Sequence, residues 1–131
     1  MHSVTPPPVT TPPSRSTSIA SVCTGGMILA ASGVLDGGAA TTKREVVPPE
    51  TSPLEVMRAS YPRIDVREAM LVERDGGVVT GGGVTLCIDT TLHLLASMLG
   101  QRVADETARI MEYQRAWRAN REAFAPVLTG Q

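Results

Sequence analysis

An apolar run that ends on a cysteine and leads at once into a helical pattern is the feature that most constrains this chain. Residues 18–22 read Ser-Ile-Ala-Ser-Val, Cys23 follows, and Thr-Gly-Gly then leads into the apolar residues 27–31. This pattern predicts a buried strand, a sharp turn that carries Cys23, and a helix. Such a turn needs small residues two positions before and after the cysteine, and Ser21 and Gly25 occupy these positions.

A cysteine on a turn of this kind is a candidate nucleophile. The first N–H groups of the following helix and the positive end of its dipole point toward the sulfur, which favours the thiolate over the thiol. The alternative is that Cys23 is a small buried hydrophobic residue, as most cysteines of intracellular chains are. The local pattern alone leaves both interpretations open.

The composition excludes several classes of protein. The chain has 131 residues, enough for one domain, with 42% hydrophobic residues and a net charge of −1. Its basic residues are interleaved with 13 acidic ones, so no nucleic-acid partner is expected. Cys23 and Cys87 lie far apart and form no CxxC pair, which predicts free thiols in a reducing compartment and neither a disulfide framework nor a metal site. No cofactor is expected.

The sequence predicts no membrane contact and no export signal. The N-terminus lacks a charged region that leads into an apolar one, and no apolar run approaches the roughly 20 residues that a spanning helix needs. A soluble, cytoplasmic protein is therefore expected. Residues 1–17 hold five of the ten prolines among Thr and Ser, which predicts a disordered tail. Residues 125–131 are expected to form a C-terminal tail.

Hydrophobic periodicity predicts alternating strands and helices between residues 18 and 124. After the first strand, further strands are expected at 39–42, 64–66, 70–72 and 78–80. The last two are expected to form a hairpin whose turn contains Asp75-Gly76. Helices are expected at 26–35, 53–61, 84–99 and 101–124, the last as one continuous element.

Several polar or glycine-rich features near the third helix allow more than one interpretation. The glycine triplet 81–83 could bind a phosphate, but it lacks the Lys-Ser/Thr ending of a P-loop, so close backbone packing is preferred. Asp89, His93 and Ser97 would share one helix face, where a solvated Asp–His pair is favoured over a catalytic histidine. Cys87 is expected on the buried side of the same helix, as inert core.

Two separated motifs, taken in order, resemble the C-terminal half of the ThiJ/PfpI family in the class I glutamine amidotransferase-like superfamily. The first comprises Ser-Val-Cys-Thr-Gly-Gly at 21–26, Ala-Ser-Gly-Val-Leu-Asp-Gly at 31–37 and Ala-Thr-Thr at 40–42. The second comprises Val-Thr-Gly-Gly-Gly-Val-Thr at 79–85 and Ile-Asp at 88–89. The chain looks most like isonitrile hydratase-like proteins and like the amidotransferase-like sensor domains that precede AraC-type regulators.

This resemblance implies an α/β fold, a flavodoxin-like three-layer sandwich with a parallel central sheet, usually assembled as a homodimer. It implies that Cys23 is the reactive cysteine, that the N–H of Thr24 helps to hold an oxyanion, and that Gly25 allows the turn. In isonitrile hydratase-like members the cysteine attacks an activated carbon and water completes the reaction. Many relatives place a histidine near the cysteine where this chain has Lys43.

The family domain begins well before the cysteine turn, where this chain has its Pro/Thr-rich segment. The sequence therefore predicts an N-terminally truncated ThiJ/PfpI domain at 18–124, related to cysteine-dependent hydratases or hydrolases and acting on a small molecule. Two alternatives stay open. One is a non-catalytic ligand-sensing domain of the AraC-associated kind. The other is a redox-sensing thiol protein in which Cys23 is oxidised to sulfenic acid.

Overall fold

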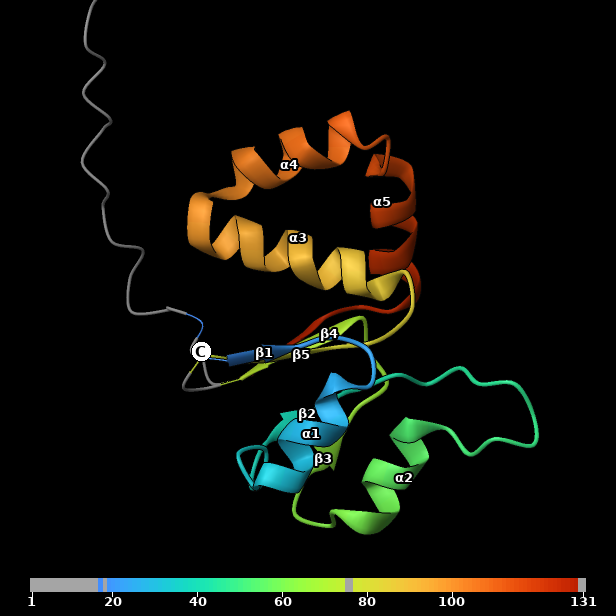
Figure 1. The fold of residues 1–131 in the computed structure, drawn as a ribbon. Coiled ribbons are helices and arrows are strands. Elements are labelled where there is room, and N and C mark those ends of the chain that lie inside the picture. Colours follow the sequence, from blue (N-terminus) through green and yellow to red (C-terminus); the bar gives the residue numbers. More distant parts are fainter. Residues whose placement is uncertain (1–16, 18, 75–76, 130–131) are drawn as a thin grey trace, which may run out of the picture.

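A computed structural model describes residues 17, 19–74 and 77–129. In this part of the chain a sheet lies between two groups of helices (Figure 1). One face is covered by three helices, which are α3 (Leu86–Leu99), α4 (Gln101–Ile110) and α5 (Gln114–Ala123). The other face carries α1 (Gly25–Ser32) and α2 (Pro53–Ser60). The predicted α/β fold class, with helices on both faces of a sheet, is confirmed.

The main sheet has the strand order β1-β5-β4-β6. Its strands are β1 (Ile19–Ser21), β5 (Val78–Gly81), β4 (Leu71–Arg74) and β6 (Val127–Leu128). A second, two-stranded sheet joins β2 (Ala39–Ala40) to β3 (Asp65–Val66). The pairs β1–β5, β4–β6 and β2–β3 are parallel, whereas β4 and β5 are antiparallel. The strand pairing within the described residues is thus mostly parallel.

The predicted hairpin is confirmed by the antiparallel register of β4 and β5, in which Leu71 lies opposite Gly81 and Arg74 opposite Val78. Its expected turn residues, Asp75-Gly76, lie outside the described residues, as do residues 1–16 of the expected tail. The cysteine turn follows β1, so its position is set by the pairing of β1 with β5. In this pairing Ser21 of β1 lies opposite Thr80 of β5.

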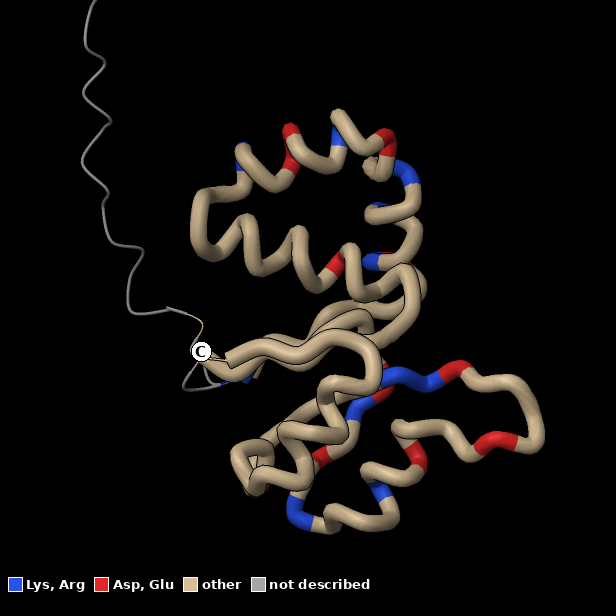
Figure 2. Tube along the Cα trace, in the orientation of Figure 1, with Lys and Arg blue, Asp and Glu red and all other residues tan. Residues whose placement is uncertain are grey.

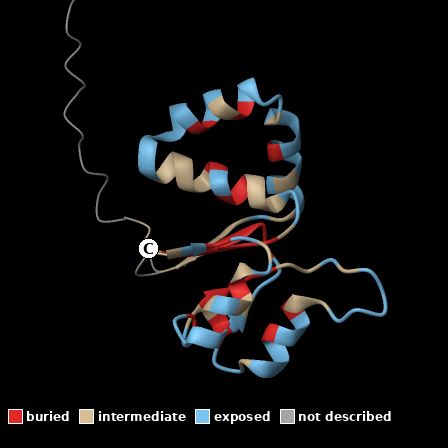
Figure 3. Cartoon of the chain, viewed as in Figure 1, coloured by how far each residue is buried: buried red, intermediate tan, exposed pale blue. Residues whose placement is uncertain are grey.

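Buried residues lie in the sheet and in helices on both of its sides (Figure 3). The cluster beneath α1 and α2 contains Ala30, Leu35, Ala40, Met57, Ile64 and Val78. The cluster beneath α3, α4 and α5 contains Met70, Leu71, Leu92, Ala104, Ala108 and Trp117. Acidic and basic positions are interspersed along the chain (Figure 2). Several of them form exposed pairs, such as Arg109 with Glu106 at 2.8 Å.

The prediction of one helix over 101–124 is wrong, because the chain turns between α4 and α5. Glu112 adopts a left-handed conformation, with φ 57°. The N–H of Tyr113 then reaches back to the carbonyl of Ala108 at 2.8 Å, which closes the end of α4. No glycine or proline marks this position in the sequence, so the helical pattern continues through it.

Several large apolar residues in and beside two of the helices are not buried. Val84, just before α3, and Leu99, at its end, are exposed. In α4 the buried residues are Ala104 and Ala108, whereas Ile110 is 72% exposed. Because alanine is small, these residues allow α4 to lie close to its neighbours. A hydrophobicity pattern gives alanine little weight and therefore does not identify it as a core residue. Residues 127–128, expected within a tail, form β6 beside β4.

Candidate functional site

Cys23 lies on the tight turn between β1 and α1. Its φ angle is 53°, in the left-handed region that L-residues seldom adopt. Its N–H donates to the carbonyl of Gly82 at 3.0 Å, and the N–H of Gly25 closes the turn on the carbonyl of Val22 at 2.9 Å. The predicted strand, sharp turn and helix are all present, with Thr24 as the residue that caps α1.

The turn is held from the other side by the segment that follows β2. The hydroxyl of Thr42, which is 1% exposed, donates to the carbonyl of Cys23 at 2.6 Å. A Cβ on Gly26 would lie 3.0 Å from the carbonyl oxygen of Thr41 and from two side-chain atoms of Thr42. A Cβ on Gly25 would meet only the Cβ of Ser21, at an ordinary 3.5 Å. Of these two glycines, Gly26 is therefore the one at which the neighbouring backbone leaves little room for a side chain.

The glycine triplet serves backbone packing, and the preference for that interpretation is confirmed. A Cβ on Gly81 would clash with the side chain of Thr90, and one on Gly82 would lie 3.0 Å from Leu86. A Cβ on Gly83 would lie 3.0 Å from the Sγ of Cys23. The triplet thus allows the chain to pass beside both α3 and the cysteine turn.

Two further side chains lie beside the Cys23 thiol. A Cβ on Gly83, which would lie 3.0 Å from the Sγ of Cys23, would also lie 3.3 Å from the Cβ and 3.2 Å from the Cγ of Lys43. Cys87, at the start of α3, donates its Sγ–H to the carbonyl of Gly82 at 3.6 Å, and the same carbonyl accepts the N–H of Cys23. Burial, followed by the neighbouring charge of Cys23, raises the pKa of the Cys87 thiol. Cys87 is only half-buried, so the expectation that it belongs to the core is wrong, whereas its inertness stays a prediction.

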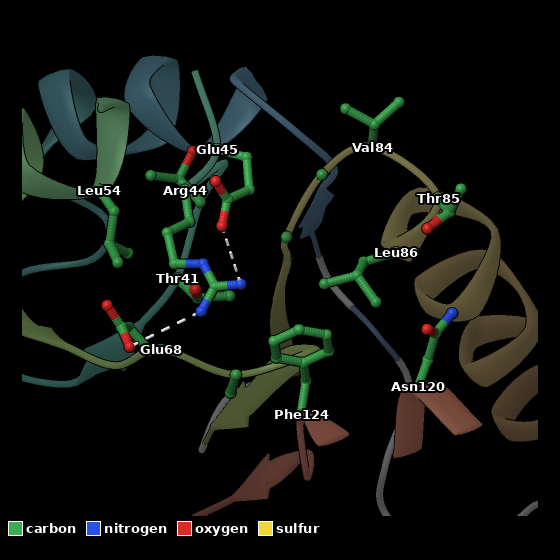
Figure 4. A pocket seen from close by; sticks show the side chains of 14 residues that line it. Thr41, Arg44, Glu45, Leu54, Glu68, Val84, Thr85, Leu86, Asn120 and Phe124 are labelled. Atoms are coloured by element: carbon green, nitrogen blue, oxygen red, sulfur yellow. Dashed lines mark ion pairs between the residues drawn. The ribbon is translucent and has the colours of Figure 1, made fainter. Parts of the chain in front are cut away.

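A cavity of about 270 Å³ opens next to this turn (Figure 4). Its lining includes Thr42 and Gly83, both of which also contact Cys23, although Cys23 is not itself a lining residue. Arg44 lies along one wall and forms ion pairs with Glu45 at 3.1 Å and Glu68 at 3.8 Å. Other walls come from Leu54, Leu86, Asn120 and Phe124.

The guanidinium of Arg44 also lies over the ring of Phe124, 4.8 Å from its centre. This contact joins the loop after β2 to the end of α5 across the cavity. Loops that follow a strand often line the site of an α/β protein, and the loop after residues 39–42 does so here. The sequence did not single out Arg44, because a basic residue in such a loop is usually solvated.

Asp89 and His93 do not form the expected solvated pair. Asp89 is completely buried and accepts a hydrogen bond from the amide of Asn120 at 2.8 Å, while its Oδ1 has no partner among the described residues. Burial raises the pKa of its carboxyl, and burial together with Asp89 raises the pKa of Tyr113 to about 12. His93 instead contacts Glu73 on β4 at 3.0 Å. Neither residue is a partner for Cys23 in these contacts.

Of the residues predicted to form the site, Cys23, Thr24 and Gly25 lie together at the start of α1, with Cys23 half-buried and Thr24 exposed. Among the described residues, the N–H of Thr24 has no hydrogen-bond acceptor. Also within that part of the chain, no group of three or more His, Cys, Asp or Glu side chains is placed to hold a metal ion. None of the helices there is long and apolar enough to cross a membrane.

Comparison with known proteins gives three informative similarities, although no family model matches the chain. Isonitrile hydratase of Pseudomonas putida is 31% identical over 98 residues, which cover 72% of this chain and 37% of that enzyme. The HTH-type transcriptional regulator CdhR of Pseudomonas aeruginosa is 33% identical over 90 residues, covering 69% of this chain and 24% of the regulator.

A solved structure gives the third similarity. It is the crystal structure of a ThiJ/PfpI family protein from Pseudomonas syringae, with a TM-score of 0.58 and 33% identity. The match covers 73% of this chain and 36% of that protein. The chain therefore spans less than two fifths of the length of each of these relatives. The similarity supports the flavodoxin-like fold that the sequence motifs imply.

Proposed function

The chain belongs to the ThiJ/PfpI family over the part that matches its relatives, and we propose that it carries a cysteine-dependent hydratase site with Cys23 as nucleophile. The single observation that supports this most strongly is the position of Cys23. A left-handed residue between a parallel strand and a helix N-terminus, beside a cavity, is where a nucleophile elbow places its side chain.

The proposed reaction adds water to a small isonitrile. The sulfur of Cys23 bonds to the terminal isonitrile carbon, and that carbon takes up the thiol proton, which gives a thioimidate. Water then adds to the same carbon, the carbon–sulfur bond breaks, and the thiol recovers a proton. The nitrogen keeps the other proton of the water, so the product is an N-substituted formamide. Each step balances without an oxidant or a cofactor.

The surroundings of Cys23 fit the charges that develop in this sequence. The exposed N–H of Thr24 and the N-terminal end of α1 lie next to the sulfur and favour the negative oxygen that forms when water adds. Lys43 is the candidate proton donor, because its stem lies beside Gly83, as the thiol of Cys23 does. The small cavity, walled by Leu54, Leu86 and Phe124, suits a compact substrate with an apolar substituent.

Turnover of a small alkyl isonitrile tests the proposal. Formation of the formamide, followed by proton NMR, is expected with the wild-type chain and is expected to be lost in Cys23→Ser. Lys43→Met is expected to reduce the rate. A matched control is Ser32→Ala, at the opposite end of α1, which is expected to keep full activity. No formamide from the folded wild-type chain, or equal turnover by Cys23→Ser, would contradict the proposal.

A second candidate function is ligand sensing without turnover, and the similarity to the regulator CdhR favours it specifically. Under this proposal the cavity binds a small molecule, and Arg44 recognises its polar end when one of the ion pairs with Glu45 or Glu68 is exchanged for the ligand. Saturable binding measured by calorimetry, unchanged in Cys23→Ser and weakened in Arg44→Met, is the expected result. Binding that requires Cys23 would contradict it.

A further inference from the structure

Cys23 and Cys87 come from distant parts of the chain, and both form a hydrogen bond with the carbonyl of Gly82. Cys23 lies in the turn after β1, and Cys87 lies in the first turn of α3. Both side chains are partly exposed, and the nearness of Cys23 contributes to the raised pKa of Cys87. The proposed hydration uses only Cys23, so it gives no role to the second thiol.

One backbone carbonyl fixes the relative position of the two cysteines. The carbonyl of Gly82 accepts the N–H of Cys23 at 3.0 Å and the Sγ–H of Cys87 at 3.6 Å. Gly83 next to it has no side chain, and a Cβ there would lie 3.0 Å from the Sγ of Cys23. The two sulfurs therefore converge beside the glycine triplet.

We propose that Cys23 and Cys87 are a peroxidatic and resolving pair, which converts oxidation of Cys23 by a hydroperoxide into a reversible Cys23–Cys87 disulfide. The site would thus be a modification site that takes hydrogen peroxide or a small organic hydroperoxide. This inference goes beyond the proposed hydration, because it requires the second cysteine and a different co-reactant.

The chemistry proceeds in two balanced steps. The Cys23 thiol releases its proton to water, and the thiolate attacks the distal oxygen of the hydroperoxide. The O–O bond breaks, and the leaving alkoxide or hydroxide takes up a proton from water, so the products are Cys23 sulfenic acid and an alcohol or water. The Cys87 sulfur then attacks the Cys23 sulfur, the S–O bond breaks, and water leaves with the Cys87 proton. Cys23 is oxidised, the hydroperoxide is reduced, and a dithiol such as dithiothreitol restores both thiols.

The surroundings of Cys87 fit the resolving role. Burial raises the pKa of the Cys87 thiol, and the neighbouring Cys23 adds to this shift. The raised pKa disfavours Cys87 as the thiol that reacts first with a hydroperoxide, because the thiolate is the attacking form.

Peptide mapping after peroxide treatment tests the pair in the full chain. Cleavage after Arg and Lys places the two cysteines in separate peptides, 16–43 and 75–102. We expect peroxide to produce a cross-linked product of these two peptides, lighter by two hydrogen atoms than their sum, within a monomeric chain. Dithiothreitol should return both peptides to their thiol form.

Variants assign the roles. In Cys87→Ser and Cys87→Ala the cross-linked product is expected to be lost, and Cys23 sulfenic acid is expected to accumulate and to be trapped by dimedone. In Cys23→Ser, Cys87 is expected to stay reduced at the same dose of peroxide. Far-UV circular dichroism checks that each variant is folded, and the wild-type cross-link needs no variant at all.

Three results would overturn the proposal. One is a disulfide between two chains instead of within one. Another is wild-type Cys23 that advances to sulfinic acid with no cross-link. The third is dimedone trapping of Cys23 that is equal with and without Cys87. None of these readouts depends on isonitrile turnover, so failure of the redox pair and failure of the proposed hydratase can be told apart.

Discussion

Replacing Cys23 by glycine is expected to leave the protein more stable than replacing it by alanine. At most positions the alanine variant is the more stable of the two. Cys23 has a φ of 53°, a conformation that costs an L-residue about 1–2 kcal/mol and costs glycine almost nothing. Glycine also lowers the free energy of unfolding by roughly 0.5–1 kcal/mol relative to alanine, because the unfolded chain is more flexible at a glycine. The net difference in the free energy of unfolding is about 1 kcal/mol in favour of Cys23→Gly.

Urea unfolding of the two variants, followed by far-UV circular dichroism, measures this difference. With a slope of about 1–2 kcal/mol per molar urea, we expect the glycine variant to unfold at a midpoint roughly 0.5–1 M higher. The matched control is the pair Ser21→Gly and Ser21→Ala in β1, where the backbone is extended and alanine should be the more stable by about 0.5–1 kcal/mol. An alanine variant at position 23 as stable as the glycine variant, or more stable, would refute the left-handed turn.

Three other perturbations test the surroundings of the turn. Gly26→Ala is expected to lower the free energy of unfolding by about 1–3 kcal/mol because of its 3.0 Å contacts, whereas Gly25→Ala, whose Cβ would make only an ordinary 3.5 Å contact, should be tolerated in the same urea assay. Thr42→Val removes the hydrogen bond to the Cys23 carbonyl and is expected to cost about 1 kcal/mol in that assay. The raised pKa of Asp89 means that this carboxyl ionises first in the unfolded state, so its contribution to wild-type stability falls as pH rises above 3.8. The stability of Asp89→Asn relative to wild type should therefore increase from pH 3 to pH 7 in urea titrations, and a constant difference would show that Asp89 titrates normally.

Local sequence signals predicted the cysteine turn because all of its requirements lie within a few residues. The apolar run before Cys23, the small residues around it and the helical spacing after it are neighbours in the chain. The hairpin of β4 and β5 and the packing role of the glycine triplet were also predictable, since each depends on residue types with few alternative uses.

Contacts that depend on strand register and on small buried residues could not be predicted in the same way. The pairing of Ser21 with Thr80 brings the Gly82 carbonyl to Cys23, and with it Cys87, but nothing in the sequence fixes that register. The break at Glu112 lacks glycine and proline, and the buried face of α4 is made of alanines. These features are set by tertiary packing and not by local propensity.

The measurement that tests the central claim most directly is site-resolved alkylation of the two cysteines in buffer and in denaturant. An accessible Cys23 at the N-terminus of α1 should react faster in the folded protein than in the unfolded chain. Cys87, whose thiol has a raised pKa, should react more slowly when folded. A folded Cys23 that reacts no faster than in denaturant would contradict the nucleophile assigned to it.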